Sequence, residues 1–155
     1  MSPMPNAIIA DTSCLIILAN IGELDLLRKV FGTIVTTGDV AQEFGEPLPI
    51  WIEIASVTDL YRQQLLEMQI DKGESSAIAL ALETPNSTVI LDDFKARKIA
   101  ERLGLRFTGT LGVMVKAKLQ GEIPSIKPLL EKMHGTNFHL SPELEEMVLQ
   151  QANEK

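Results

Sequence analysis

Short apolar runs alternate with helical patterns along the whole chain, and this alternation restricts the fold more than any other feature. Runs rich in β-branched and aliphatic residues predict strands at residues 7–10, 33–36, 88–91 and 105–108, with a weaker candidate at 54–57. Apolar residues at helical spacing predict helices after Asp11, from Ser141 onward, and over residues 24–31, 40–44, 73–82, 93–103, 111–119 and 125–133. Strands separated by helices in this way are typical of an α/β fold with a parallel sheet covered on both faces.

Length and composition agree with one globular domain. The 155 residues are 45% hydrophobic and 23% charged, which is enough apolar material to bury a core and argues against disorder. We therefore expect a single domain over residues 1–155, with a C-terminal helical extension over roughly residues 123–155.

Several classes of protein are excluded by what the chain lacks. Cys14 is the single cysteine, so an intramolecular disulfide is impossible, and a thiolate or histidine-rich zinc site is not expected. The apolar run over residues 7–19 is interrupted by polar residues and is too short to cross a membrane. Residues 1–6 carry no basic stretch of the kind that opens a signal peptide. We expect a cytoplasmic protein with no membrane partner.

Acidic residues follow two of the predicted strands at the point where each strand ends. Asp11 comes directly after the first strand, and Asp92 and Asp93 follow the run at 88–91. In open parallel sheets the reactive crevice lies beyond the carboxyl ends of the strands, so these acids are expected at one edge. Glu43 and Glu74, on the helices at 40–44 and 73–82, are expected to join them.

This set of carboxylates suits a hard divalent cation, for which oxygen ligands are preferred. A bound Mg²⁺ lowers the pKa of a water molecule and offsets the charge that builds on the oxygens of a phosphodiester during hydrolysis. Each candidate also has a purely structural interpretation, as a helix cap, a turn residue, a partner of the helix dipole or a solvated side chain. These interpretations apply to Asp11, Thr12, Ser13, Glu43, Glu74, Asp92, Asp93 and Thr110. The joint placement of the acids, rather than any one of them, favours a metal site.

Basic residues gather in the segment that follows Asp93. The formal net charge of the chain is −7, which alone argues against a nucleic-acid partner. Residues 94–118 nevertheless hold seven of the fourteen basic residues and one acid, Glu101. The basic set consists of Lys95, Arg97, Lys98, Arg102, Arg106, Lys116 and Lys118. Lys95, Arg97 and Lys116 are the candidate phosphate contacts, with Arg97 placed best because it lies one helical turn beyond Asp93. Aromatic residues are few, so extensive base stacking is not indicated.

The order of these motifs resembles the PIN-domain family of metal-dependent nucleases. The shared features are the opening strand with Asp11-Thr12-Ser13, a Val-x-x-Glu helix ending at Glu43, Gly73-Glu74-x-x-Ala-Ile, Leu-Asp92-Asp93-x-x-Ala-Arg and the Gly109-Thr110-Leu-Gly sequence. The last three are similar to a prokaryotic toxin-type subgroup with a Gly-Thr-Leu-Gly motif. The resemblance spans residues 7 to about 120, which is most of the chain.

The resemblance implies a Rossmann-like, three-layer α/β/α sandwich with a central parallel sheet. It also implies a pocket for Mg²⁺ or Mn²⁺, ribonuclease activity toward single-stranded RNA, and a role as the toxin of a toxin–antitoxin pair. Asp11, Glu43 and Glu74 match the first three acids of the family, with Glu74 standing where many members have aspartate, and Asp92 or Asp93 matches the fourth. Thr12, Ser13 and Thr110 would support the site through their hydroxyl groups, and the Gly109-Thr110 helix start would offer N–H groups to a phosphate.

Two classes of function remain open on the sequence. The first is the metal-dependent endoribonuclease, and the alternative is a non-catalytic nucleic-acid-binding or regulatory protein-interaction module on the same fold. A phosphate-transfer receiver is disfavoured because the chain lacks the aspartate and lysine pattern that such a protein needs. A homodimer or higher homo-oligomer is expected to bury apolar residues of helices near 47–70 and of the tail over 140–149.

Overall fold

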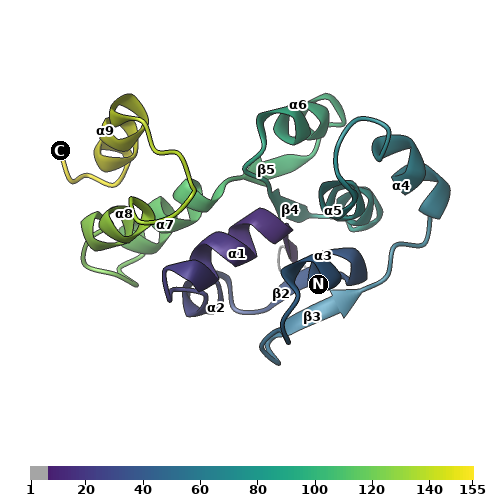
Figure 1. The fold of residues 1–155 in the computed structure, drawn as a ribbon, viewed down its shortest axis with the longest axis horizontal. Coiled ribbons are helices and arrows are strands. Elements are labelled where there is room, and N and C mark those ends of the chain that lie inside the picture. Colours follow the sequence, from purple (N-terminus) through teal and green to yellow (C-terminus); the bar gives the residue numbers. More distant parts are fainter. Residues whose placement is uncertain (1–6) are drawn as a thin grey trace, which may run out of the picture.

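The computed structural model describes residues 7–155 as an α/β fold built around one parallel sheet (Figure 1). The sheet has five strands in the order β3-β2-β1-β4-β5, and every pair of neighbours is parallel. The strands are β1 (Ala7–Ala10), β2 (Ile34–Thr37), β3 (Ile52–Ala55), β4 (Ser87–Ile90) and β5 (Arg106–Thr108). The prediction of an α/β fold with a central parallel sheet is confirmed. The prediction about a signal peptide falls on residues 1–6, which lie outside the described residues.

Helices cover both faces of the sheet and give the three layers that were predicted. One layer contains α1 (Thr12–Asn20), α2 (Asp25–Phe31), α7 (Thr110–Leu119), α8 (Lys127–Met133) and α9 (Pro142–Gln151). The other contains α4 (Leu60–Leu66), α5 (Lys72–Glu83) and α6 (Phe94–Arg102). The short helix α3 (Gly38–Phe44) contacts α1 and α5. Figure 1 shows α7, α8 and α9 gathered at the end of the molecule opposite α4.

Alternation along β1 separates two hydrophobic cores. Ile8 and Ala10 belong to the core under α1, α2 and α7, whereas Ile9 belongs to the core under α5 and α6. This is the pattern of a strand buried on both faces, in which successive side chains point to opposite layers. The C-terminal helices share the first core through Met133 and Val148, so that layer extends well past α7.

The strand order reverses between β1 and β4, and this topology determines where a site can form. The chain runs outward from β1 to β2 and β3, and then returns to the other side of β1 for β4 and β5. At such a switch point the connections leave the sheet in opposite directions, which opens a crevice at the carboxyl ends of the two central strands. Asp11 follows β1 and Asp92 follows β4, so both acids lie at this crevice.

Several element boundaries differ from the prediction, most of all in the middle of the chain. The strand predicted at 54–57 is observed two residues earlier, as β3. Because β3 is an edge strand and its Ile54 is 59% exposed, hydrophobicity does not mark where this strand begins and ends. The expected helices near 47–70 reduce to α4 alone, since β3 occupies the first half of that segment. In the terminal helix, Ser141 is the N-cap as predicted, and its hydroxyl oxygen accepts the Leu144 N–H at 3.1 Å. Within residues 7–155 no helix is long and apolar enough to span a bilayer.

Candidate active site

Asp11 is the most deeply buried acid at the switch point. It is the N-cap of α1, where its Oδ1 accepts the Thr12 N–H at 2.7 Å, and it is only 2% exposed. Burial is the main cause that raises its pKa from the ordinary 3.8 to about 8; the hydrogen bond from Thr12 opposes the shift, and the nearby carboxylates of Glu74, Asp71 and Asp92 add to it. Asp11 therefore keeps a proton at neutral pH unless a cation compensates its charge.

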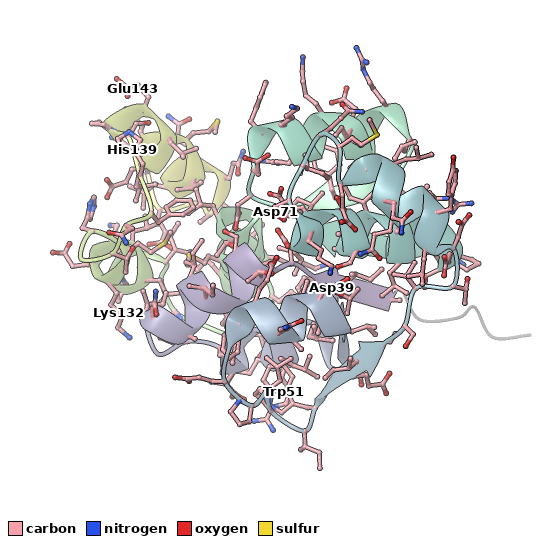
Figure 2. The ribbon with its side chains drawn as sticks, turned by 45° about the vertical axis from the view of Figure 1, so that its right-hand side comes forward. Asp39, Trp51, Asp71, Lys132, His139 and Glu143 are labelled. Atoms are coloured by element: carbon pink, nitrogen blue, oxygen red, sulfur yellow. The ribbon has the colours of Figure 1, made fainter. Side chains whose placement is uncertain are left out.

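Glu74 enters the same region from the start of α5, together with a second acid that was not predicted. Asp71 is the N-cap of α5, and the two residues form a reciprocal capping box: Asp71 Oδ1 accepts the Glu74 N–H at 2.8 Å, and Glu74 Oε1 accepts the Asp71 N–H at 3.3 Å. Burial raises the pKa of Glu74 to about 7, with added repulsion from Asp71 and Asp93. Figure 2 shows Asp71 near the middle of the molecule, beside α5.

The signal for Asp71 was available in the sequence. Asp71-Lys72-Gly73-Glu74 places an aspartate three residues before a glutamate at the start of an alanine-rich helix, which is the pattern of a capping box. Glu74 is among the predicted site residues, whereas Asp71, the other half of this capping box, is not. The functional consequence is that α5 brings two carboxylates, rather than one, toward Asp11.

Glu43 is exposed on α3 but is tied to both α1 and α5. Its Oε1 accepts the Thr12 hydroxyl at 2.6 Å, and its Oε2 accepts the backbone N–H of Gly73 at 3.1 Å. A Cβ built on Gly73 would collide with the Glu43 carboxylate and would lie 2.8 Å from the Thr12 hydroxyl. A side chain at position 73 would therefore displace the Glu43 carboxylate from its present position.

Asp92 and Asp93 have different surroundings, although they are adjacent. Asp92 Oδ1 accepts the Thr110 N–H at 2.7 Å, and its Oδ2 accepts the hydroxyls of Thr110 at 2.6 Å and Ser13 at 3.1 Å. Asp93 is exposed and is the N-cap of α6, accepting the Ala96 N–H at 2.9 Å. Asp92 thus accepts hydrogen bonds from residues of α1 and α7, whereas Asp93 caps the N-terminus of α6.

The hydroxyl residues have roles that differ from helix capping. Thr12 and Ser13 do not cap α1, because Asp11 is the N-cap and the two hydroxyls donate to Glu43 and Asp92. Thr110 is likewise not the N-cap of α7, since Gly109 occupies that position. These hydroxyl groups hold carboxylates in place, as outer-shell donors do around metal ligands.

The donor set matches a hard cation in chemistry. All of its members are carboxylates, and burial, with added repulsion from neighbouring acids, raises the pKa of Asp11 and Glu74. Bound Mg²⁺ or Mn²⁺ would relieve that repulsion through oxygen ligands. As the side chains stand, no three of the histidine, cysteine, aspartate and glutamate residues within 7–155 converge closely enough to hold an ion. A cation would therefore have to draw the carboxylates together.

The three predicted phosphate contacts lie in different parts of the structure. Arg97 borders the cavity that contains Asp92, and its guanidinium lies over the Phe107 ring at 5.2 Å from the centroid. Lys95 is exposed on α6. Lys116 lies over the Phe31 ring at 5.0 Å and borders a separate cavity that contains none of the predicted acids. The structure therefore brings Arg97, but not Lys116, to the acidic edge.

These observations can be compared with known protein families. A family model described as DUF3368, PIN domain, matches residues 7–154. The chain belongs to the PIN-domain family. No curated protein matches it. The PIN domain is a nuclease-type fold, and PIN nucleases typically use divalent metal ions, so the match supports a hydrolase that acts on nucleic acids.

Proposed function

We propose that this PIN-domain protein is a Mg²⁺- or Mn²⁺-dependent endoribonuclease that hydrolyses phosphodiester bonds of single-stranded RNA. The observation that carries the proposal is the position of Asp11, which is 2% exposed at the switch point and is surrounded by other acids. A protein gains nothing in stability from burying a carboxylate among like charges. Such an arrangement is typical of a site whose negative charge is compensated by a bound cation.

The proposed catalytic acids are Asp11, Glu43, Glu74 and Asp93, and Asp92 is included among the metal ligands. Asp71 joins this set because its carboxylate acts on both Asp11 and Glu74. When bound, the metal would supply an acidified water and charge compensation for the phosphodiester. Thr12, Ser13 and Thr110 would keep the carboxylates oriented, so that little reorganisation is needed when substrate arrives.

Arg97 is the proposed phosphate contact closest to the acids. It borders the same cavity as Asp92, and within residues 7–155 no carboxylate forms an ion pair with it. A guanidinium that is held by an aromatic ring keeps its N–H donors available to a phosphate. Lys95 adds positive charge on the exposed side of α6, whereas Lys116 borders a different cavity from Arg97.

The proposal extends to the partners predicted from the sequence. We propose a cytoplasmic toxin that is neutralised by an antitoxin protein and that forms a homodimer or higher oligomer. Apolar side chains on β3, on α4 and in the turn after α4 support an interface of this kind, because Ile54, Leu60, Tyr61, Leu65 and Met68 are each more than half exposed. Sedimentation or light scattering of the purified protein tests the oligomeric part, and a strictly monomeric protein would contradict it.

A non-catalytic nucleic-acid-binding or protein-interaction module is the second candidate. It is favoured by the finding that no three metal-binding side chains converge within residues 7–155. Titration calorimetry with Mn²⁺ separates the two. Binding that is lost in Asp11→Asn supports the nuclease, whereas the absence of carboxylate-dependent binding supports the module.

Cleavage of labelled RNA tests the proposed activity directly. Single-stranded RNA, double-stranded RNA and single-stranded DNA of one sequence are incubated with the protein in Mg²⁺, Mn²⁺ or EDTA. We expect cleavage of the single-stranded RNA only with metal, and its loss in Asp11→Asn. Asp25→Asn is the matched control, because Asp25 is an exposed acid paired with Arg28 at 2.7 Å on α2. Full activity of Asp11→Asn would refute the proposal.

A further inference from the structure

Two cavities of about the same size meet at the Arg97–Phe107 stack. Each has a volume of about 340 Å³, and both are bordered by Asp92, Arg97 and Phe107. The first extends between β5 and the C-terminal helix, where Phe138, Leu144, Met147 and Gln151 line it. The second extends over α6, where Phe94, Lys98 and Glu101 line it. The stack therefore lies where two hollows adjoin, beside an acid of the candidate site.

The walls of both cavities combine flat apolar surfaces with a few polar groups. Three of the five phenylalanines of the chain, Phe94, Phe107 and Phe138, border one cavity or the other. Phe94 is 74% exposed and Met147 is 48% exposed, although both are large apolar residues. In the first cavity, the Gln151 amide offers both a hydrogen-bond donor and an acceptor. Composition gave no indication of base stacking, because it could not reveal that three of the seven aromatic residues border these cavities.

The size and chemistry of the cavities fit one nucleobase each. Pockets that bury small ligands span about 300–1,000 Å³, so 340 Å³ lies at the lower end of that range. Unpaired bases bind proteins by stacking on aromatic rings and by hydrogen bonding along their edges. A guanidinium between two such pockets lies where the phosphate that joins two consecutive nucleotides would pass.

We propose that two consecutive unpaired nucleotides straddle Arg97, with one base in the cavity lined by Phe138, Met147 and Gln151 and the other on the exposed face of Phe94. The inference rests on the proposed function, because it assumes that the ligand is a single strand. It adds to that function a pair of base subsites and a role for α9. Gln151 is the residue that would distinguish one base from another in the first subsite, since an amide pairs selectively with base edges.

The guanidinium of Arg97 supports a nucleic-acid strand over an apolar peptide. Arg97 and Lys98 border the second cavity together with Asp92 and Glu101, so the lining carries no net formal charge. Within residues 7–155 no carboxylate forms an ion pair with Arg97, which leaves its N–H donors available to a phosphate. An apolar peptide side chain would use the ring of Phe94 but would leave the guanidinium and the Gln151 amide without a role. A nucleotide uses all three, because it presents a phosphate, a flat ring and polar ring edges.

Binding of a fluorescein-labelled RNA hexanucleotide of mixed sequence tests the two subsites. Fluorescence anisotropy is measured with the full chain in EDTA and in Ca²⁺, and the integrity of the probe is checked on a denaturing gel. Phe94→Ala and Gln151→Ala each have a matched control on the same protein. Leu119→Ala removes an exposed apolar side chain, 56% exposed, from α7, and Gln150→Ala removes the neighbouring exposed amide of α9.

We expect Phe94→Ala to weaken binding about tenfold and Gln151→Ala to change the preference among hexanucleotides that differ in one base, whereas both controls bind like the natural chain. Equal affinities for Phe94→Ala and Leu119→Ala, the absence of any binding by the natural chain, or equal binding of a double-stranded probe would each overturn the inference. The readout does not require cleavage. A protein that binds through Phe94 but cleaves no RNA with any metal would refute the proposed activity and leave the base subsites standing.

Discussion

Replacing Asp11 with asparagine is expected to stabilise the metal-free protein, and the gain is expected to grow with pH. Burial and the neighbouring acids raise the pKa of Asp11 from 3.8 to about 8. Between these values the folded protein keeps a proton that the unfolded chain loses, so the stability present below pH 3.8 is lost as the pH rises through 8. Each pH unit in this interval costs about 1.4 kcal/mol, or about 4 kcal/mol between pH 5 and pH 8.

Asparagine removes this titration and keeps the local geometry. Its side-chain oxygen can still accept the Thr12 N–H, and asparagine and aspartate are equally good N-caps. The difference in unfolding free energy between Asp11→Asn and the natural chain should therefore increase by about 4 kcal/mol from pH 5 to pH 8. Urea titrations in EDTA, followed by circular dichroism at four pH values, measure this difference. A difference that stays constant with pH would refute the claim that Asp11 is buried among like charges.

Three further predictions concern residues around the carboxylates. Gly73→Ala is expected to displace the Glu43 carboxylate, because the added Cβ would occupy its place, and to weaken Mn²⁺ binding in calorimetry about tenfold; unchanged affinity would contradict this. Thr110→Val removes a hydroxyl donor from Asp92 and should lower the unfolding free energy by about 1–3 kcal/mol, whereas Thr110→Ser should not. Cys14 is fully buried, and burial raises the pKa of its thiol. The fraction of Cys14 that a thiol reagent labels should therefore rise with urea in parallel with unfolding, and rapid labelling in native buffer would contradict this prediction.

The central part of the fold could be predicted because its signals are local. The apolar run before Asp11 and the run before Asp92 read as buried strands, and parallel strands bring their carboxyl ends to one edge. The positions of these two acids therefore follow from the sequence. At the edge of the sheet the same reasoning is weaker. Ile54 of β3 is exposed, so hydrophobicity does not mark the boundaries of that strand.

The organisation of the site around Asp92 could not be predicted, because it depends on contacts between distant segments. Ser13 and Thr110 lie 79 and 18 residues from Asp92 in sequence, and both donate hydrogen bonds to it. Locally, each of these residues reads as a helix cap. The choice between capping its own helix and holding a distant carboxylate is made by tertiary packing, which no local pattern records.

Lys116 shows the same limit for charge patterns. Its place in a basic segment suggested a phosphate contact, but α7 packs against α2 and turns the ammonium over the Phe31 ring. Which face of a helix meets solvent near a site depends on its rotation within the layer. Arg97 of the basic segment 94–118 borders the cavity that contains Asp92, whereas Lys116 of the same segment borders a different one.

The central claim is that the acids at the switch point bind a divalent cation. The most direct measurement is the anomalous scattering of crystals soaked in Mn²⁺ and collected beside an EDTA-treated crystal. We expect an anomalous peak at the carboxyl ends of β1 and β4, in contact with Asp11 and with acids at the start of α5, that disappears in Asp11→Asn crystals. A crystal in millimolar Mn²⁺ that has no peak at this position, or has peaks only at surface acids such as Asp25, would show that the acids at the switch point do not bind the cation.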